Sequence, residues 1–88
     1  MKGDWKAGDV VRSAAGHDAG RLFVVLDATD GTFVWIADGK TRTVEKPKKK
    51  KRKHLKAVSA APMHLMTEAR PINAEVRKFL KACEQNLA

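Results

Sequence analysis

The lysines and arginines are the residues whose number and spacing most strongly suggest a chemical role. Between Lys46 and Lys56, eight of eleven residues are basic and none is acidic, whereas the rest of the chain holds ten of each sign. The whole formal net charge of +8 is therefore concentrated in this one block. Such a block attracts a polyanion, because its cations displace the counterions that condense on phosphates. Nucleic acid is the first candidate partner, and an anionic membrane surface is the alternative.

The block has no aromatic residue among its lysines. Lysine carries a point charge on a flexible stem, so we expect a flexible cationic loop that lies along an RNA backbone and binds phosphates without recognising bases. Two other interpretations stay open. The block could be a solvated, disordered loop that aids solubility, or Pro47 to Lys53 could be a nuclear localisation signal.

Groups for catalysis are sparse. His17, His54 and His64 are far apart, and no short spacing links them to Cys83 or to a pair of carboxylates. The sequence has no glycine-rich nucleotide loop and no Cys-x-x-Cys pair. We therefore expect no catalytic site, metal or cofactor, and no enzymatic activity. The single cysteine cannot form an internal disulfide, and we expect Cys83 to be a small buried hydrophobe.

The elements that must position the basic residues are mostly strands. Short apolar or β-branched runs alternate with turn residues, which indicates a small, mainly β barrel or sandwich. Trp5 is expected to cover an open end of it. The predicted turns are Asp30-Gly31 and Asp38-Gly39, and the predicted strands are Val10-Val11, Leu22–Leu26, Thr32–Ala37, Thr41–Val44 and His54–Val58.

Aromatic residues in the predicted strands must divide between the core and the surface. We expect Phe23, and either Phe33 or Trp35, to fill part of the core. Because neighbouring residues of a strand face opposite sides, Phe33 and Trp35 would share one face, and Val34 and Ile36 the other. An outward Trp35 would pack under a terminal segment, which is the commoner case, or stack on a base.

The C-terminal segment changes to a helical period. Asn73 is the expected N-cap, and Glu75 falls in the first turn, where the helix dipole favours an acid. The spacing predicts a helix over residues 74–86, with one apolar face formed by Val76, Phe79, Leu80, Cys83 and Leu87. The expected organisation is a barrel over residues 1–58, with the basic loop 46–56 in it, a connector over 59–71 and the helix within 72–88.

The segment from Gly8 to Arg21 resembles the KOW motif, which is a strand, a loop that ends in a glycine and a basic residue, and a hydrophobic second strand. Gly20 matches the signature glycine, because the chain must turn sharply there and glycine accepts a positive φ without strain. Arg21 follows at the loop exit, where its guanidinium can bind a phosphate. Leu22 and Phe23 stand where many KOW motifs have a second glycine.

The resemblance extends beyond the motif. The chain is similar to the KOW barrels of archaeal and eukaryotic large-subunit ribosomal proteins, and to short bacterial KOW-domain proteins with Lys-His-Leu after a basic run and an Asn-x-x-x-Arg helix. Here these are Lys53-His54-Leu55 and Asn73 to Arg77. The similarity covers residues 5–60 well and 72–85 loosely. It implies an SH3-like β-barrel with a C-terminal helix that binds RNA, usually ribosomal RNA, through its loops.

These observations predict a cytoplasmic RNA-binding protein of the ribosome or of ribosome assembly. Its expected partner is ribosomal RNA, with ribosomal proteins as a second candidate. A membrane is not expected as a partner, because no apolar run is long enough to span a bilayer. The alternative is a protein-interaction module that uses the barrel rim or the C-terminal helix. The residues expected to contact RNA are Arg12, His17, Arg21, Lys40, Arg42, Lys46, Lys48, Lys49, Lys50, Lys51, Arg52, Lys53 and Lys56.

Overall fold

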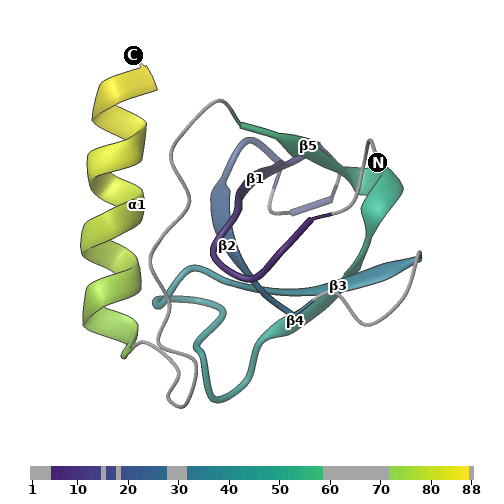
Figure 1. Ribbon diagram of the computed structural model, residues 1–88, viewed down its shortest axis with the longest axis horizontal. Coiled ribbons are helices and arrows are strands. Elements are labelled where there is room, and N and C mark those ends of the chain that lie inside the picture. Colours follow the sequence, from purple (N-terminus) through teal and green to yellow (C-terminus); the bar gives the residue numbers. More distant parts are fainter. Residues whose placement is uncertain (1–4, 15, 18, 28–31, 59–71, 88) are drawn as a thin grey trace.

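The described part of the chain is mainly β, with one α-helix near its C-terminal end (Figure 1). The computed structural model describes residues 5–14, 16–17, 19–27, 32–58 and 72–87. For residues 86 and 87 it describes the backbone but not the side chains. The predicted turn at Asp30-Gly31 and the predicted connector over 59–71 lie outside the described residues.

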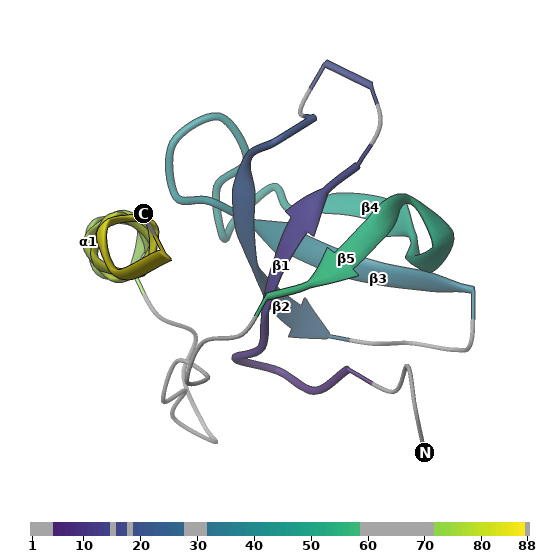
Figure 2. The ribbon, with the colours of Figure 1, turned by 90° about the horizontal axis from the view of Figure 1, so that it is seen from above.

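Five strands form one antiparallel sheet in the order β4-β3-β2-β1-β5. Consecutive strands β4 and β5 lie at opposite edges of this sheet, yet they are joined only by the three-residue 3-10 helix η1. The sheet must therefore curve until its edges approach each other, as Figures 1 and 2 show. The elements are β1 (Val10–Ser13), β2 (Leu22–Asp27), β3 (Phe33–Ala37), β4 (Lys48–Lys51), η1 (Arg52–His54), β5 (Leu55–Ala57) and α1 (Asn73–Leu87).

Strand β2 is buried on both of its faces, which explains its unbroken apolar sequence. Phe23 and Val25 point to the concave side, where they join an inner cluster. Leu22 and Val24 point to the convex side and pack under α1. The inner cluster consists of Val11, Phe23, Val25, Val34, Ile36 and Leu55, with Trp5 packed against it.

Helix α1 lies on the convex face, beside β2 (Figure 2). Val76, Leu80 and Cys83 are buried in an outer cluster, and Phe79 is partly buried against it. The apolar face predicted from the sequence is thus confirmed for these four residues. Leu87 was predicted to share it, but its side chain lies outside the described part of the structure.

The predicted N-cap of α1 is wrong by one residue. Asn73 is the first helical residue, and the carbonyl of Ile72 accepts the hydrogen bonds of Glu75 and Val76. The Glu75 carboxylate reaches back to the Ile72 backbone N–H at 3.2 Å, as in a capping box. The Asn73 side chain is engaged elsewhere, because its Oδ1 accepts a hydrogen bond from the Val44 N–H at 2.8 Å.

The strand predicted at Thr41–Val44 is absent, because side chains take the backbone donors that a ladder would need. Asp38 Oδ1 accepts hydrogen bonds from the N–H groups of Lys40 and Arg42. The Asp38-Gly39 turn closes on the Arg42 carbonyl, and the Val44 N–H binds Asn73. Residues 38–44 therefore form a loop, from which Val44 enters the outer cluster.

The basic block is not the flexible loop expected from its composition. Lys48–Lys51 is strand β4, paired with β3, and Arg52–His54 is η1. Pairing with the apolar strand β3 overrides the low strand propensity of lysine. The fifth predicted strand, His54–Val58, is confirmed over Leu55–Ala57.

The aromatic residues of β3 do not fill the core. Val34 and Ile36 have no exposed surface, whereas Phe33 and Trp35 are partly exposed on the convex face. The prediction that one of the two rings lies in the core is wrong, and the predicted division of the four residues into two faces is confirmed. Branched residues fill the narrow interior beside Phe23.

Candidate nucleic-acid interface

Strand β4 presents its lysines alternately to the two faces of the sheet. Lys49 and Lys51 lie opposite Trp35 and Phe33 on the convex face, and both are exposed. Lys48 and Lys50 lie opposite Ile36 and Val34 on the concave side. The four lysines are thus fixed in two rows by backbone pairing.

Lys50 joins the two sequence features expected to bind RNA. Its side chain is 9% exposed, so it is not part of a solvated run. A β-carbon placed on Gly16 would lie 3.7 Å from Lys50 Nζ, so the ammonium group ends beside the loop that connects β1 and β2. The long lysine stem crosses apolar surface while its charge reaches the rim of the sheet.

The corner between β4 and η1 holds a small basic pocket of about 300 Å³. The Arg52 N–H donates to the Thr32 carbonyl at 2.8 Å, which fixes the corner against the start of β3. The Arg52 guanidinium also lies 5.2 Å from the centroid of the Trp5 ring. The pocket is lined by Thr32, Lys51, Arg52 and Lys53.

Gly20, in the loop between β1 and β2, has the positive φ predicted for it. Gly20 has a φ of +88°, and its N–H donates to the Ser13 carbonyl at 2.8 Å. The Ser13 N–H in turn donates to the Arg21 carbonyl at 3.0 Å. Gly20 therefore closes the loop at the point where β2 begins, and directs Arg21 toward the loop that follows β3.

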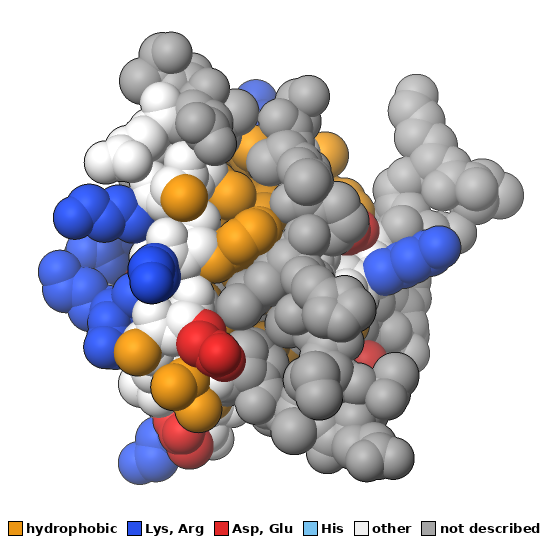
Figure 3. Space-filling view, turned by 60° about the vertical axis from the view of Figure 1, so that its left-hand side comes forward, with side chains coloured by type: hydrophobic (Ala, Val, Ile, Leu, Met, Phe, Trp, Pro, Cys, Tyr) orange, Lys and Arg blue, Asp and Glu red, His pale blue; other side chains and the backbone are white. Residues whose placement is uncertain are grey.

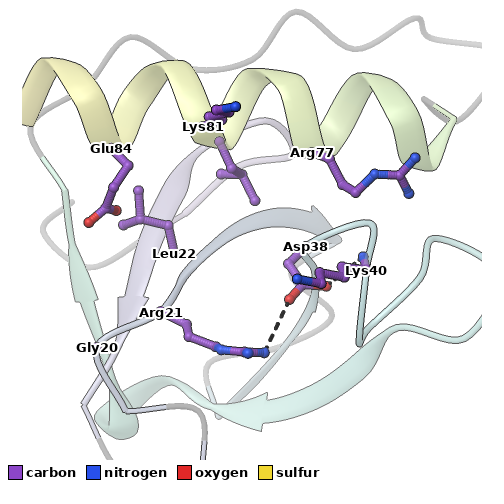
Figure 4. Close-up of a pocket in the computed structure, with 9 residues that line it drawn as sticks. Gly20, Arg21, Leu22, Asp38, Lys40, Arg77, Lys81 and Glu84 are labelled. Atoms are coloured by element: carbon purple, nitrogen blue, oxygen red, sulfur yellow. Dashed lines mark hydrogen bonds and ion pairs between the residues drawn. The ribbon is translucent and has the colours of Figure 1, made fainter.

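A second pocket, of about 510 Å³, lies between the β1–β2 loop, the loop after β3 and α1 (Figure 4). Figure 3 shows basic side chains gathered along one flank of α1. The helix adds Arg77 and Lys81 to this second pocket, which we call the groove, and neither residue was among the predicted RNA contacts. Their spacing of four residues on one helix face was the available signal. The groove is lined by Gly20, Arg21, Leu22, Asp38, Lys40, Arg77, Leu80, Lys81 and Glu84.

Two arginines near the groove already bind oxygen atoms of the protein itself. Arg21 Nη1 lies 3.8 Å from Asp38 Oδ2 and donates to Thr41 Oγ1 at 3.1 Å. Arg12, on the convex face of β1, donates to the Gly20 carbonyl at 2.6 Å and lies 3.7 Å from Glu84 of α1. The groove is therefore less strongly basic than the β4–η1 corner.

The other predicted RNA contacts are spread over the surface. Lys56 pairs with Arg12 across β1 and β5, on the convex face. The exposed set is His17, Lys40, Lys46, Lys53 and Lys56, and the partly exposed set is Arg42, Lys48 and Arg52. Of the predicted residues, the structure thus brings Lys51, Arg52 and Lys53 together at the β4–η1 corner and places Arg21 and Lys40 in the groove, and it does not bring the others into either pocket.

Among the residues that the structure describes, two groups have pKa values that depart from their ordinary values. A hydrogen bond from Asn73 Nδ2 to Glu45 Oε1, 2.8 Å long, lowers the pKa of the exposed Glu45 carboxyl. Burial raises the pKa of the Cys83 thiol, which matches the prediction of a buried small hydrophobe. Within the described residues, no three His, Cys, Asp or Glu side chains are grouped so that they could hold a metal ion.

Comparison with models of known protein families gives no match, and comparison with curated proteins gives no significant match. None of the helices described here is long and apolar enough to cross a membrane. The features that indicate a function are therefore the fold, the charge distribution and the geometry of the two pockets.

Proposed function

We propose that this chain is an SH3-like barrel of the KOW type that binds RNA, with ribosomal RNA as its target and the cytoplasm as its location. Three observations support the proposal. The strand order has β4 and β5 at opposite edges joined by a single 3-10 turn. The glycine that matches the KOW signature has a positive φ. The exposed lysines of β4 and η1 form a fixed array.

The array of Lys49, Lys51 and Lys53 is the observation that carries the proposal. Residues two apart in a strand are separated by about 6.6–6.8 Å, which is close to the spacing of successive phosphates in an extended RNA strand. Because pairing with β3 fixes the backbone of β4, Lys49 and Lys51 lose less freedom on binding than the lysines of a mobile loop would. Lys53 follows directly in η1. The proposed activity is binding and not catalysis.

The groove beside α1 would then orient a structured RNA. Its cations come from three separate segments, so only a ligand of matching shape can reach several of them. Contacts between phosphates and the β4–η1 corner would supply most of the affinity. The groove would determine the position and orientation of the RNA on the protein.

The alternative, a protein-interaction module based on the apolar face of α1, has weaker support. Val76, Leu80 and Cys83 are already buried against the sheet. A partner would have to displace the helix before it could use them. A partner protein could still bind the barrel rim. The experiment below distinguishes RNA binding from this alternative.

The test is the salt dependence of RNA binding. Two variants carry the same change of net charge: Lys49→Gln with Lys51→Gln in β4, and Lys6→Gln with Lys78→Gln outside it, all at exposed positions. Each phosphate contact adds about 0.7–0.9 to the slope of log affinity against log salt. The β4 pair should therefore flatten the slope for a ribosomal RNA fragment by about 1.5, and the control pair by much less. Equal slopes for parent and β4 variant would refute the proposed interface.

A further inference from the structure

Cross-strand register places aromatic rings among the lysines, although the sequence of the block contains none. On the convex face, Phe33 lies opposite Lys51 and Trp35 lies opposite Lys49. This face therefore alternates rings from β3 with cations from β4. Neither Phe33 nor Trp35 belongs to the cluster that α1 covers.

One lysine lies over both rings. Lys49 Nζ is 4.7 Å from the centroid of Phe33 and 5.9 Å from that of Trp35. Both rings keep part of their surface exposed, and Lys49 itself is exposed. A cation–π contact at an exposed site is weak, so the lysine can move from the rings to a nearby phosphate at little cost.

Phe33 lies next to the basic pocket at the β4–η1 corner. Thr32, which precedes Phe33, lines that pocket, and Lys51 both lines it and lies opposite Phe33. A flat apolar surface and a pocket with three cations are thus adjacent. This is the pair of surfaces that a nucleotide needs, one for its base and one for its phosphate.

We propose that the convex face of β3 and β4 binds unpaired nucleotides of RNA, with a base against Phe33 or Trp35 and a phosphate in the pocket of Lys51, Arg52 and Lys53. The inference rests on the proposed RNA-binding function and narrows its substrate to single-stranded segments. Bases inside a duplex are stacked on one another and cannot offer a face to a ring, whereas bases of loops and ends can. Stacking tolerates any base, so this surface selects strandedness and not sequence.

The test uses tryptophan fluorescence. Trp5→Phe leaves Trp35 as the single tryptophan. Oligouridylate should quench this fluorescence, whereas inorganic polyphosphate of similar charge, which has no bases, should not. In the same background, Trp35→Leu keeps an apolar side chain but removes the ring. Because no tryptophan then remains, its binding is measured by the anisotropy of a labelled oligouridylate and by competition with polyphosphate. The substitution should lower the affinity for oligouridylate about tenfold, within the range expected for the loss of one stacked base. The affinity for polyphosphate and the salt slope should not change.

Phe79→Leu is the matched control, because it removes a ring of similar exposure from α1. It should leave oligouridylate binding as in the parent. Trp35→Phe restores an aromatic face and should recover most of the affinity, which separates stacking from any damage to the fold. If oligouridylate binds without quenching, and both Trp35→Leu and Phe33→Leu bind it like the parent, this inference is overturned while RNA binding stands. If no RNA binds even at low salt, the proposed function itself fails.

Discussion

Gly39 is the point at which the loop after β3 touches the first turn of α1. It has a φ of +76°, and a β-carbon on it would clash with the Asn73 carbonyl oxygen. Gly20 has a similar φ of +88°, but a β-carbon there would meet no atom within 4 Å. The two glycines therefore share backbone strain on substitution, and only Gly39 adds a steric clash. The sequence could not distinguish them, since the contact partner is more than thirty residues away.

Gly39→Ala should accordingly destabilise the protein more than Gly20→Ala. A left-handed backbone costs a residue with a β-carbon roughly 1–2 kcal/mol, and this is the whole effect expected at Gly20. At Gly39 the loop or the helix must also shift, so the loss in free energy of unfolding should exceed about 2 kcal/mol. Urea denaturation of the two variants and the parent measures both values. Equal losses would mean that α1 does not approach Gly39 this closely.

The four lysines of β4 show how one residue type serves different purposes at neighbouring positions. Lys50 is 9% exposed and Lys49 lies over two rings, whereas Lys51 lines the basic pocket. Composition predicted their shared charge. Their separate surroundings depend on the register with β3, which a run of identical residues does not encode. For this reason Lys50 is left intact in the charge variants above.

At the scale of elements, the Asn-x-x-x-Arg pattern of α1 has a structural explanation. Asn73 and Arg77 are four residues apart and lie on one face of the helix. Asn73 accepts from the Val44 N–H, and Arg77 Nη1 donates to the Gly39 carbonyl at 2.6 Å. Both side chains thus fasten the start of α1 to the loop between β3 and β4. The pattern could be seen in the sequence, but its partners could not, because the loop was predicted as a strand.

Leu80→Ala tests whether α1 is an integral part of the fold. Leu80 is 7% exposed and packs in the outer cluster with Leu22 and Val24 of β2. Its truncation should lower the free energy of unfolding by about 2–4 kcal/mol. Lys78→Ala, at an exposed position of the same helix, should change it by less than about 0.5 kcal/mol.

Thermal or urea unfolding followed by circular dichroism gives both values. If Leu80→Ala unfolds like the parent but loses an interaction with another protein, α1 is a docking element, and the protein-interaction alternative gains support.

At the scale of the whole molecule, one curved sheet separates two apolar clusters. The sequence predicted the mainly β fold, four of the five strands, the final helix and its apolar face, because these follow from hydrophobic period and turn residues. It did not predict β4, because four consecutive lysines show no alternation of polar and apolar residues. It also did not predict the groove beside α1, because the groove is lined by segments that are distant in the chain. Local patterns were thus sufficient for the elements, and long-range pairing determined the candidate site.

The concentration of charge should also make the stability of the molecule sensitive to ions. Lys49 and Lys51 project from the same face of β4, and residues two apart in a strand are about 6.6–6.8 Å apart. Two unit charges at that separation repel by about 0.6 kcal/mol in water, and added salt screens this repulsion within a Debye length of about 8 Å at physiological ionic strength. An unfolded chain can turn the two side chains away from each other, whereas β4 holds both on one face. The repulsion is therefore harder to relieve in the folded state, and salt should favour that state.

Raising sodium chloride from about 20 mM to about 300 mM, which shortens the Debye length roughly fourfold, should therefore raise the urea midpoint of the parent. The rise should be smaller in the variant with Lys49→Gln and Lys51→Gln than in the control with Lys6→Gln and Lys78→Gln, although both lose two positive charges.

RNA binding should stabilise the protein as well. Short single-stranded RNA at about 100 times its dissociation constant should raise the free energy of unfolding of the parent by about 2.7 kcal/mol, because it binds the folded state. The salt experiment has its own outcome that would contradict it. If the urea midpoint rises by the same amount in all three proteins, Lys49 and Lys51 do not repel each other in the folded state, and the pairing of β4 described here is wrong.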